Sequence, residues 1–157
     1  MSTKRWLGIS VSGDKVIAVD AKINSSGSVI IQSDQSWKLQ SGDRNAAYAV
    51  MHQQVMDYVQ NNGIKKVIVK ASALVTGGST KLAHLHAAEL RGVVIAAAAS
   101  HCTVITLAKA LISRTFGNRK VDEYLKDDSF WSSKINGALR NGSREAAMLL
   151  LAAKDES

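Results

Sequence analysis

Runs of apolar residues separated by turn-forming segments mark the first third of the chain. Residues 5–11 form a short apolar run, residues 15–23 alternate between apolar and polar side chains, and residues 28–39 form a third run. Alternation with a period of two is the pattern of a half-exposed strand. Ser12-Gly-Asp14 and residues 24–27 (Asn-Ser-Ser-Gly) separate the runs as turns. We therefore expect an antiparallel meander of three strands.

Helical spacing appears in the middle of the chain. Ala47, Met51, Val55 and Val59 recur every four residues, which predicts an amphipathic helix over residues 45–60. Residues 64–72 and 103–108 are apolar runs that read as buried strands. One long, largely apolar helix is predicted between them, over residues 81–100. A strand, a crossover helix and a strand form a parallel βαβ unit.

The C-terminal part completes the predicted order of elements. Residues 107–116 and 120–128 have helical character, residues 129–142 show no clear pattern, and residues 143–154 predict a terminal helix. The order β-β-β-α-β-α-β-α is that of the ribonuclease H-like fold, an α/β fold. It has a five-stranded mixed sheet, three strands antiparallel and two parallel, with helices on both faces. The length predicts a single domain over residues 1–157.

The balance of charge favours an anionic partner. Lys and Arg outnumber Asp and Glu by 20 to 13, giving a formal net charge of +7. Such an excess suits nucleic acid or an acidic protein face. Plain solubility is the alternative explanation, and the net charge alone does not separate the two.

The sequence also bears on location. A single cysteine, Cys102, excludes an internal disulfide and suits a reducing cytoplasm. The N-terminal apolar run is short and interrupted, unlike a signal peptide. Membrane spans need about 20 predominantly apolar residues, and no uninterrupted run of that kind occurs. We therefore predict a cytoplasmic protein with no membrane partner.

Several segments together resemble RuvC-type Holliday junction resolvases. They are residues 6–10 (Trp-Leu-Gly-Ile-Ser), 67–70 (Val-Ile-Val-Lys), 90–98 (Leu-Arg-Gly-Val-Val-Ile-Ala-Ala-Ala) and 143–147 (Ser-Arg-Glu-Ala-Ala). They stand where that family has its first strand, its fourth strand, its apolar helix and its last helix. The chain is also similar to a bacterial family of unknown function with the same layout. The resemblance implies the ribonuclease H-like fold and a nucleic-acid partner, DNA more than RNA.

The same resemblance implies a catalytic site that this chain lacks. The family holds two Mg²⁺ ions with acids from the first strand, the fourth strand and the last helix, and these ions drive phosphodiester cleavage. The matching positions here are Ser10, Lys70, Ser143 and Ala146, and Glu145 is the one acid nearby. We therefore expect no metal, no cofactor and no metal-dependent cleavage, although an active nuclease stays a lesser alternative.

Two further questions concern the charges near these positions. Asp14 and Asp20 lie on the first hairpin, and either could in principle join Glu145 in a metal site. Lys70 has two interpretations: its ammonium could hold a phosphate where the metals sat, or it could simply extend into water. The structural interpretation of Lys70 is the commoner one.

Other combinations carry weaker signals. His84 and His86 are two residues apart, so they point to different sides of a helix, unlike zinc-binding pairs at i and i+4. Residues 76–81 (Thr-Gly-Gly-Ser-Thr-Lys) place glycines and a lysine before a helix but lack the spacing of a phosphate loop. Helix N-termini can bind anions, but a plain loop is the commoner use.

Basic residues after the fifth strand suggest a nucleic-acid surface. In the resolvases the equivalent region faces DNA. Phe130 and Trp131 could stack on bases or anchor this region in the core, and core anchoring is the commoner use. The complete set of candidate nucleic-acid contacts is Lys70, Lys81, Lys109, Arg114, Arg119, Lys120, Lys134 and Arg140.

The long helix suggests self-association. RuvC-like proteins pair through this helix, so the resemblance implies a two-fold homodimer through the segment from Lys81 to Ser100. A buried central helix in a monomer is the alternative. Two functions therefore stay open: a catalytically degenerate nucleic-acid binder, and a protein-interaction or regulatory module with the same fold.

Overall fold

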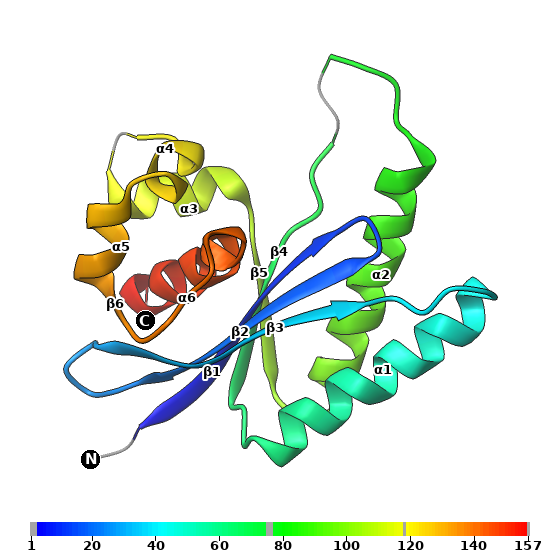
Figure 1. The fold of residues 1–157 in the computed structure, drawn as a ribbon, viewed down its shortest axis with the longest axis horizontal. Coiled ribbons are helices and arrows are strands. Elements are labelled where there is room, and N and C mark those ends of the chain that lie inside the picture. Colours follow the sequence, from blue (N-terminus) through cyan, green and yellow to red (C-terminus); the bar gives the residue numbers. More distant parts are fainter. Residues whose placement is uncertain (1–2, 75–76, 118, 157) are drawn as a thin grey trace.

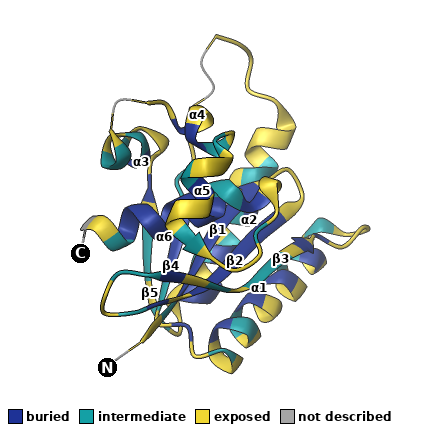
Figure 2. Cartoon of the chain, turned by 60° about the vertical axis from the view of Figure 1, so that its left-hand side comes forward, coloured by how far each residue is buried: buried dark blue, intermediate teal, exposed yellow. Residues whose placement is uncertain are grey.

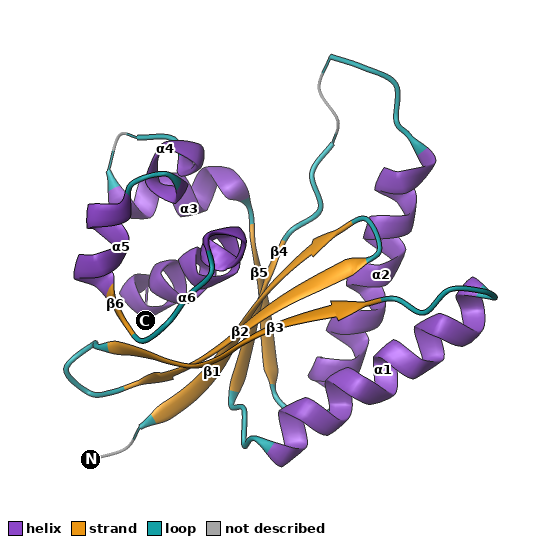
Figure 3. Ribbon diagram, viewed as in Figure 1, coloured by secondary structure: helices purple, strands orange, loops and turns teal. Residues whose placement is uncertain are grey.

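The centre of the fold is a single twisted sheet. The computed structural model describes residues 3–74, 77–117 and 119–156. Six strands among these residues pair in the order β5-β4-β1-β2-β3-β6 (Figure 1, Figure 3). Their bounds are Lys4–Ser12 (β1), Lys15–Ile23 (β2), Val29–Lys38 (β3), Lys66–Lys70 (β4), Thr103–Leu107 (β5) and Ile135–Asn136 (β6).

Strand directions confirm the predicted arrangement and add one strand to it. β1, β2 and β3 pair antiparallel, and β4 and β5 extend the sheet in parallel on the β1 side. The prediction of five strands was one strand short. β6 pairs in parallel with Val29 and Ile30 of β3. A strand of two residues is too short to show alternation, so no local pattern could announce it.

Helices cover both faces of the sheet. α1 and α2 lie on one face, and α6 lies across the other, with α3, α4 and α5 grouped beside it (Figure 1). Their bounds are Arg44–Asn61 (α1), Leu82–Ala99 (α2), Lys109–Phe116 (α3), Val121–Leu125 (α4), Asp128–Lys134 (α5) and Arg144–Glu156 (α6). A short 3-10 turn, η1 (Asn141–Ser143), leads into α6.

The region between β5 and α6 departs most from prediction. The helix predicted over residues 120–128 is two helices, because α4 ends at Leu125 and α5 begins at Asp128. The side chain of Asp127 accepts a hydrogen bond from the Phe130 backbone N–H, which caps the new helix. An N-cap of this kind stabilises a fresh helix start. The Asp127 cap therefore starts a second helix within a segment that the sequence pattern predicted to be one continuous helix.

The amphipathic stripe of α1 is confirmed. Ala47, Met51, Val55 and Val59 are all buried. Asp43 is the N-cap, and its carboxylate accepts hydrogen bonds from two backbone N–H groups of the first turn. Cap and stripe together fix where this helix begins and which face it turns to the sheet.

Two apolar cores, one on each face of the sheet, follow from the alternation of β1. Leu7 and Ile9 pack with the core under α1 and α2, whereas Trp6 packs with the core under α6. Figure 2 shows buried residues along β1 and β2, along α6 and along one side of α1. Gly8 also faces α6. A Cβ atom added at Gly8 would lie 2.3 Å from the carbonyl oxygen of Ala146. The absence of a side chain therefore lets α6 lie directly against β1.

α2 is an apolar helix packed as one layer of this fold. By length and mean hydropathy it could cross a membrane, and 22% of the window that meets those criteria is buried. Leu90 and Val94 are fully buried in the core that α2 shares with α1. Glu89 accepts a hydrogen bond from Tyr48 of α1. These contacts hold α2 against α1 and the sheet.

Candidate functional site

Three sequence-predicted positions meet where two strands and a helix converge. Ser10 is near the end of β1, Lys70 is the last residue of the adjacent parallel strand β4, and Glu145 is in the first turn of α6. Side chains at every second position of a strand share a face. Ser10 shares its face with Trp6, and Lys70 shares its face with Ile68, and both neighbours pack in the core under α6.

One carboxylate oxygen joins the three side chains. Lys70 Nζ lies 2.9 Å from Glu145 Oε1. Ser10 Oγ donates a hydrogen bond of 3.1 Å to the same oxygen. The Lys70 and Glu145 side chains are each 25% exposed, and Ser10 is 9% exposed. The site is therefore a partly buried ion pair supported by a hydroxyl.

The charges of this site balance within the protein. The Lys70 ammonium neutralises Glu145, and the positive end of α6 favours the carboxylate in its first turn. A divalent cation at this point would meet a single carboxylate that is already paired, together with a fixed positive charge. Among the described residues no three His, Cys, Asp or Glu side chains form a group that could hold a metal ion.

The two acids of the first hairpin lie elsewhere. Asp20 is fully buried and forms an ion pair with Arg5 at 2.7 Å, and it accepts a hydrogen bond from Tyr58 of α1. It therefore faces α1, on the side of the sheet opposite Glu145. Asp14 is paired with Arg44 at 2.8 Å, at the N-terminal end of α1. Neither acid joins Glu145.

Ser143 and Ala146 do not extend the site. The buried Ser143 hydroxyl donates a hydrogen bond of 2.6 Å to Asp34 of β3. Ala146 is fully buried where α6 presses on Gly8. The two positions therefore serve the packing of α6, and only Glu145 of this segment reaches Ser10 and Lys70.

Asp34 also fixes one of the candidate nucleic-acid contacts. Arg140 forms an ion pair with Asp34 at 2.8 Å and donates a backbone N–H to the same carboxylate. Burial acts to raise the pKa of Asp34, but the hydrogen bonds from Arg140 and Ser143 outweigh it and leave this pKa below its ordinary value. Arg140 thus has a structural task, closing the loop before α6 onto β3.

Other candidate cations divide into paired and unpaired residues. Lys109 pairs with Asp122 at 3.2 Å, and Arg119 pairs with Asp127 at 2.9 Å. Lys134 lies over the Phe130 ring. Within the described part of the chain Lys134 also lacks an acidic partner. Among the described residues, Lys81, Arg114 and Lys120 are the candidate cations with neither an ion pair nor an aromatic contact, and all three are exposed.

The aromatic side chains of this region form a cluster. Trp131 is 3% exposed, and its indole N–H donates to the Tyr124 carbonyl. Phe130 packs edge-on against Phe116 and Trp131. Core anchoring is therefore the use of Trp131, as the commoner of the two interpretations predicted.

The described residues of the glycine-containing loop before α2 and the two histidines of α2, His84 and His86, take no part in the Lys70–Glu145 ion pair. Thr76, the first residue of the glycine-containing loop, lies outside the described residues, and residues 77–81 are exposed. His84 accepts a hydrogen bond from the Lys81 backbone N–H, so its ring caps the start of α2. The two histidines show no metal-binding arrangement with any other described residue.

Sequence reasoning missed the pairing at the centre of the site. It placed Ser10 and Lys70 on their strands and included Glu145 among the site positions. It aligned the acids of the last helix with Ser143 and Ala146, however, and predicted no contact between Glu145 and Lys70. The available signal was charge, since Glu145 is the one acid in its segment. The close approach of α6 to β1 depends on Gly8, and no local pattern reveals that contact.

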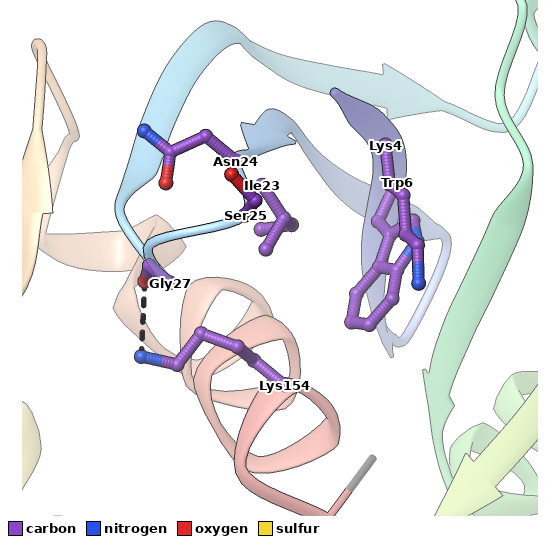
Figure 4. A pocket seen from close by; sticks show the side chains of 7 residues that line it. All are labelled: Lys4, Trp6, Ile23, Asn24, Ser25, Gly27 and Lys154. Carbon is purple, nitrogen blue, oxygen red and sulfur yellow. Dashed lines mark hydrogen bonds between the residues drawn. The ribbon is translucent and has the colours of Figure 1, made fainter. Parts of the chain in front are cut away.

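A separate hollow lies at the opposite end of β1. It has a volume of about 330 Å³, and Trp6, Lys4 and Lys154 line it (Figure 4). The Lys154 ammonium donates a hydrogen bond to the Gly27 carbonyl across its edge. None of the three residues of the ion-pair site lines this hollow.

Solved structures show the same fold. The chain is similar to Thermus thermophilus RuvC at 12% identity, with a TM-score of 0.75, over 96% of this chain and 93% of that one. It is also similar to that RuvC in complex with a Holliday junction substrate, at 11% identity and a TM-score of 0.72, with the same coverage. The yeast mitochondrial Holliday junction resolvase matches at 13% identity and a TM-score of 0.65, over 97% of this chain and 79% of that one.

No family model and no curated protein matches the sequence. At identities this low the likeness establishes the fold alone. The predicted ribonuclease H-like, RuvC-like architecture is therefore confirmed, and the function has to be argued from the residues.

Proposed function

We propose that this protein is a catalytically degenerate RuvC-like protein that binds nucleic acid without metal-dependent cleavage. One observation carries the loss of cleavage: Lys70 Nζ is 2.9 Å from Glu145 Oε1. The ammonium lies at the meeting point of β1, β4 and α6, the three elements from which the resolvases draw their metal ligands. Two-metal cleavage requires several carboxylates around two cations, and here one carboxylate is bound to an internal cation.

Binding does not need those metals. Nucleic-acid affinity comes mainly from cations that replace the counterions of the phosphates. Lys81, Arg114 and Lys120 are exposed and have no acidic partner among the described residues, so they carry this role best. Lys109, Arg119, Lys134 and Arg140 are already engaged with groups of this protein, so we expect smaller contributions from them.

The test is binding of the purified protein to labelled four-way junction, duplex and single-stranded DNA and to duplex RNA, across a salt series, with and without Mg²⁺. We expect salt-dependent binding to DNA in preference to RNA, with all strands intact in Mg²⁺. The double variant Arg114→Met, Lys120→Met should lower the salt slope by about 2, one for each lost phosphate contact.

A matched control uses two exposed lysines away from α3 and α4. Lys22→Met with Lys38→Met removes the same charge from β2 and β3 and should change binding much less. Equal losses of DNA affinity in the two double variants would show that binding depends on the net charge alone and not on Arg114 and Lys120. Absence of binding at low salt, or cleavage that appears with Mg²⁺, would refute the proposal.

A second function is favoured by exposed leucines at the start of α2. Leu82 and Leu85 are 65% and 52% exposed, and Leu74, in the loop between β4 and α2, is 94% exposed. Leu82 and Leu85 are three residues apart on α2 and so lie on the same side of the helix. Adjacent exposed apolar side chains of this kind mark protein–protein contacts. As the alternative we propose a protein-interaction module whose partner is a second copy of this chain, joined through α2 in the reducing cytoplasm.

Sedimentation velocity across a concentration series tests this alternative. We expect a monomer–dimer equilibrium that Leu82→Asp and Leu85→Asp shift to monomer, because a carboxylate at a buried apolar contact is strongly unfavourable. Val50→Asp, at an exposed apolar position on α1, is the control and should leave the equilibrium unchanged. A single monomeric species at every concentration would exclude the homodimer.

A further inference from the structure

Among the described residues, Arg91 has no acidic partner. Its side chain extends from α2 to the C-terminal ends of β1 and β4, on the α2 side of the sheet. Its guanidinium donates to Ser72 Oγ at 2.6 Å and to the Val11 carbonyl oxygen at 3.2 Å. Both acceptors are neutral, so neither cancels its charge. The Arg91 Nε is buried and has no hydrogen-bond partner.

The other arginines show how unusual this is within the chain. Among the described residues, five of the seven arginines form ion pairs with aspartates, and Arg114 lies on the open surface. Arg91 alone is half-buried and unpaired. Burial lowers the pKa of Arg91 accordingly, since the charge loses solvent and gains no counter-charge. A buried cation is costly when it lacks a partner.

A cavity lies directly at this guanidinium. Its volume is about 450 Å³, and besides Arg91 it is lined by Ser12, Gly13, Ser72 and His84. The alanines of α2 that complete its wall are small, so the space stays open. None of the described residues that line the cavity is acidic.

The polar side chains of the lining can all donate hydrogen bonds. The two serines offer hydroxyl groups. His84 accepts the Lys81 backbone N–H at Nδ1, so a neutral ring carries its proton on Nε2, which remains available. Guanidinium, hydroxyl and imidazole donors around one hollow match the four oxygens of a tetrahedral phosphate better than the two of a planar carboxylate.

We propose that this cavity binds a phosphate group, as the terminal phosphate of a nucleotide or as a phosphodiester of nucleic acid. The bound anion supplies the counter-charge that Arg91 lacks, and the planar guanidinium can meet two of its oxygens at once. The inference does not rest on the nucleic-acid function, because a phosphomonoester would meet the same donors.

The experiment records amide and arginine side-chain NMR signals of the full chain during titrations. The probes are inorganic phosphate, a nucleoside 5′-monophosphate, a dinucleoside monophosphate and, as a planar anion, acetate. We expect saturable shifts at Ser12, Ser72 and Arg91 with the phosphates and not with acetate. At ten times Kd the melting temperature should rise by about 4 °C.

Variants assign the effect to the guanidinium. Arg91→Met should abolish the shifts, and Arg91→Lys should weaken binding about tenfold, because an ammonium keeps the charge but loses the fork. Lys22→Met, on β2, removes the same charge elsewhere and should bind phosphate like the wild type. Should Arg91→Met fail to fold, the wild-type titration and Arg91→Lys still decide the matter.

The outcomes separate the sources of the phosphate. Saturation by the monophosphate alone identifies a small phosphorylated ligand, and saturation by the dinucleoside monophosphate identifies a nucleic-acid backbone. Binding of either one by a protein that fails to bind DNA would leave this inference standing and refute the nucleic-acid function. No saturable shift in the cavity, or equal shifts with acetate, would overturn the inference.

Discussion

Lys70 and Glu145, 75 residues apart in the chain, form an ion pair of 2.9 Å at the junction of β1, β4 and α6. It is the relationship on which the candidate site depends. The Lys70 ammonium and the Ser10 hydroxyl both donate to the same carboxylate oxygen. Each residue of this trio comes from a different element, so the pair also joins α6 to the sheet.

The ion pair should contribute modestly to stability. Lys70→Met leaves Glu145 partly buried with only Ser10 as a donor, so we expect the free energy of unfolding to fall by about 1 kcal/mol. A double-mutant cycle measures the coupling: urea denaturation of the wild type, of Lys70→Met, of Glu145→Gln and of the double variant that combines them. A coupling energy of about 0.5–1 kcal/mol is expected, and a coupling of zero would show that the two charges do not interact.

Carboxylates at two positions should create a metal site. Ser10→Asp with Lys70→Glu would place three acids at the point where Glu145 now meets the ammonium. Their mutual repulsion should destabilise the protein without metal, and Mg²⁺ or Mn²⁺ should restore it, because hard cations prefer clustered oxygen ligands.

Isothermal calorimetry with each metal measures metal binding by the double variant, and thermal denaturation measures how much stability the bound metal restores. The triple variant that adds Glu145→Gln is the control and should bind more weakly. An absence of metal binding in the double variant would mean that the three side chains do not converge as the ion pair indicates.

The contact between α6 and β1 should tolerate no side chain at Gly8. In Gly8→Ala the new Cβ would lie 2.3 Å from the Ala146 carbonyl oxygen, so α6 has to shift. We expect a loss of about 3 kcal/mol in the free energy of unfolding.

Gly92→Ala is the matched control for that substitution. Gly92 lies within α2, and a Cβ added there meets no atom within 4 Å. Alanine has the higher helix propensity, so this variant should gain up to about 1 kcal/mol. Comparable losses in the two variants would contradict the close approach of α6 to Gly8.

The Tyr58 hydroxyl should lose its proton at a higher pH than an ordinary tyrosine, and the stability of the protein should therefore fall at alkaline pH. Burial raises the pKa of Tyr58 to about 12, and the adjacent Asp20 carboxylate adds to the rise. The folded pKa exceeds the unfolded one, so the contribution of Tyr58 is complete below the unfolded pKa. It is then lost as the pH rises through the folded pKa.

Ultraviolet titration of the phenolates and urea denaturation across alkaline pH test this behaviour. Tyr58→Phe should remove the late phenolate and its share of the alkaline loss of stability, whereas Tyr48→Phe should keep both. Persistence of the late transition in Tyr58→Phe would assign it to another tyrosine.

Local patterns in the sequence determined the order and the type of most elements. The period of four in α1 and the apolar runs of β4 and β5 are properties of short segments, because burial of one face of a helix or strand needs only nearby residues. From that order followed the mixed sheet and the ribonuclease H-like arrangement. Ser10 and Lys70 could be placed because they belong to such segments.

Tertiary structure decided what those residues meet. Glu145 reaches Lys70 because the absence of a side chain at Gly8 lets α6 lie against β1. Asp20 is removed from the site because strand alternation turns it to the opposite face, toward Tyr58. β6 likewise pairs with a strand about a hundred residues earlier. Contacts across such separations depend on how whole elements pack, and a local periodicity carries no information about that packing.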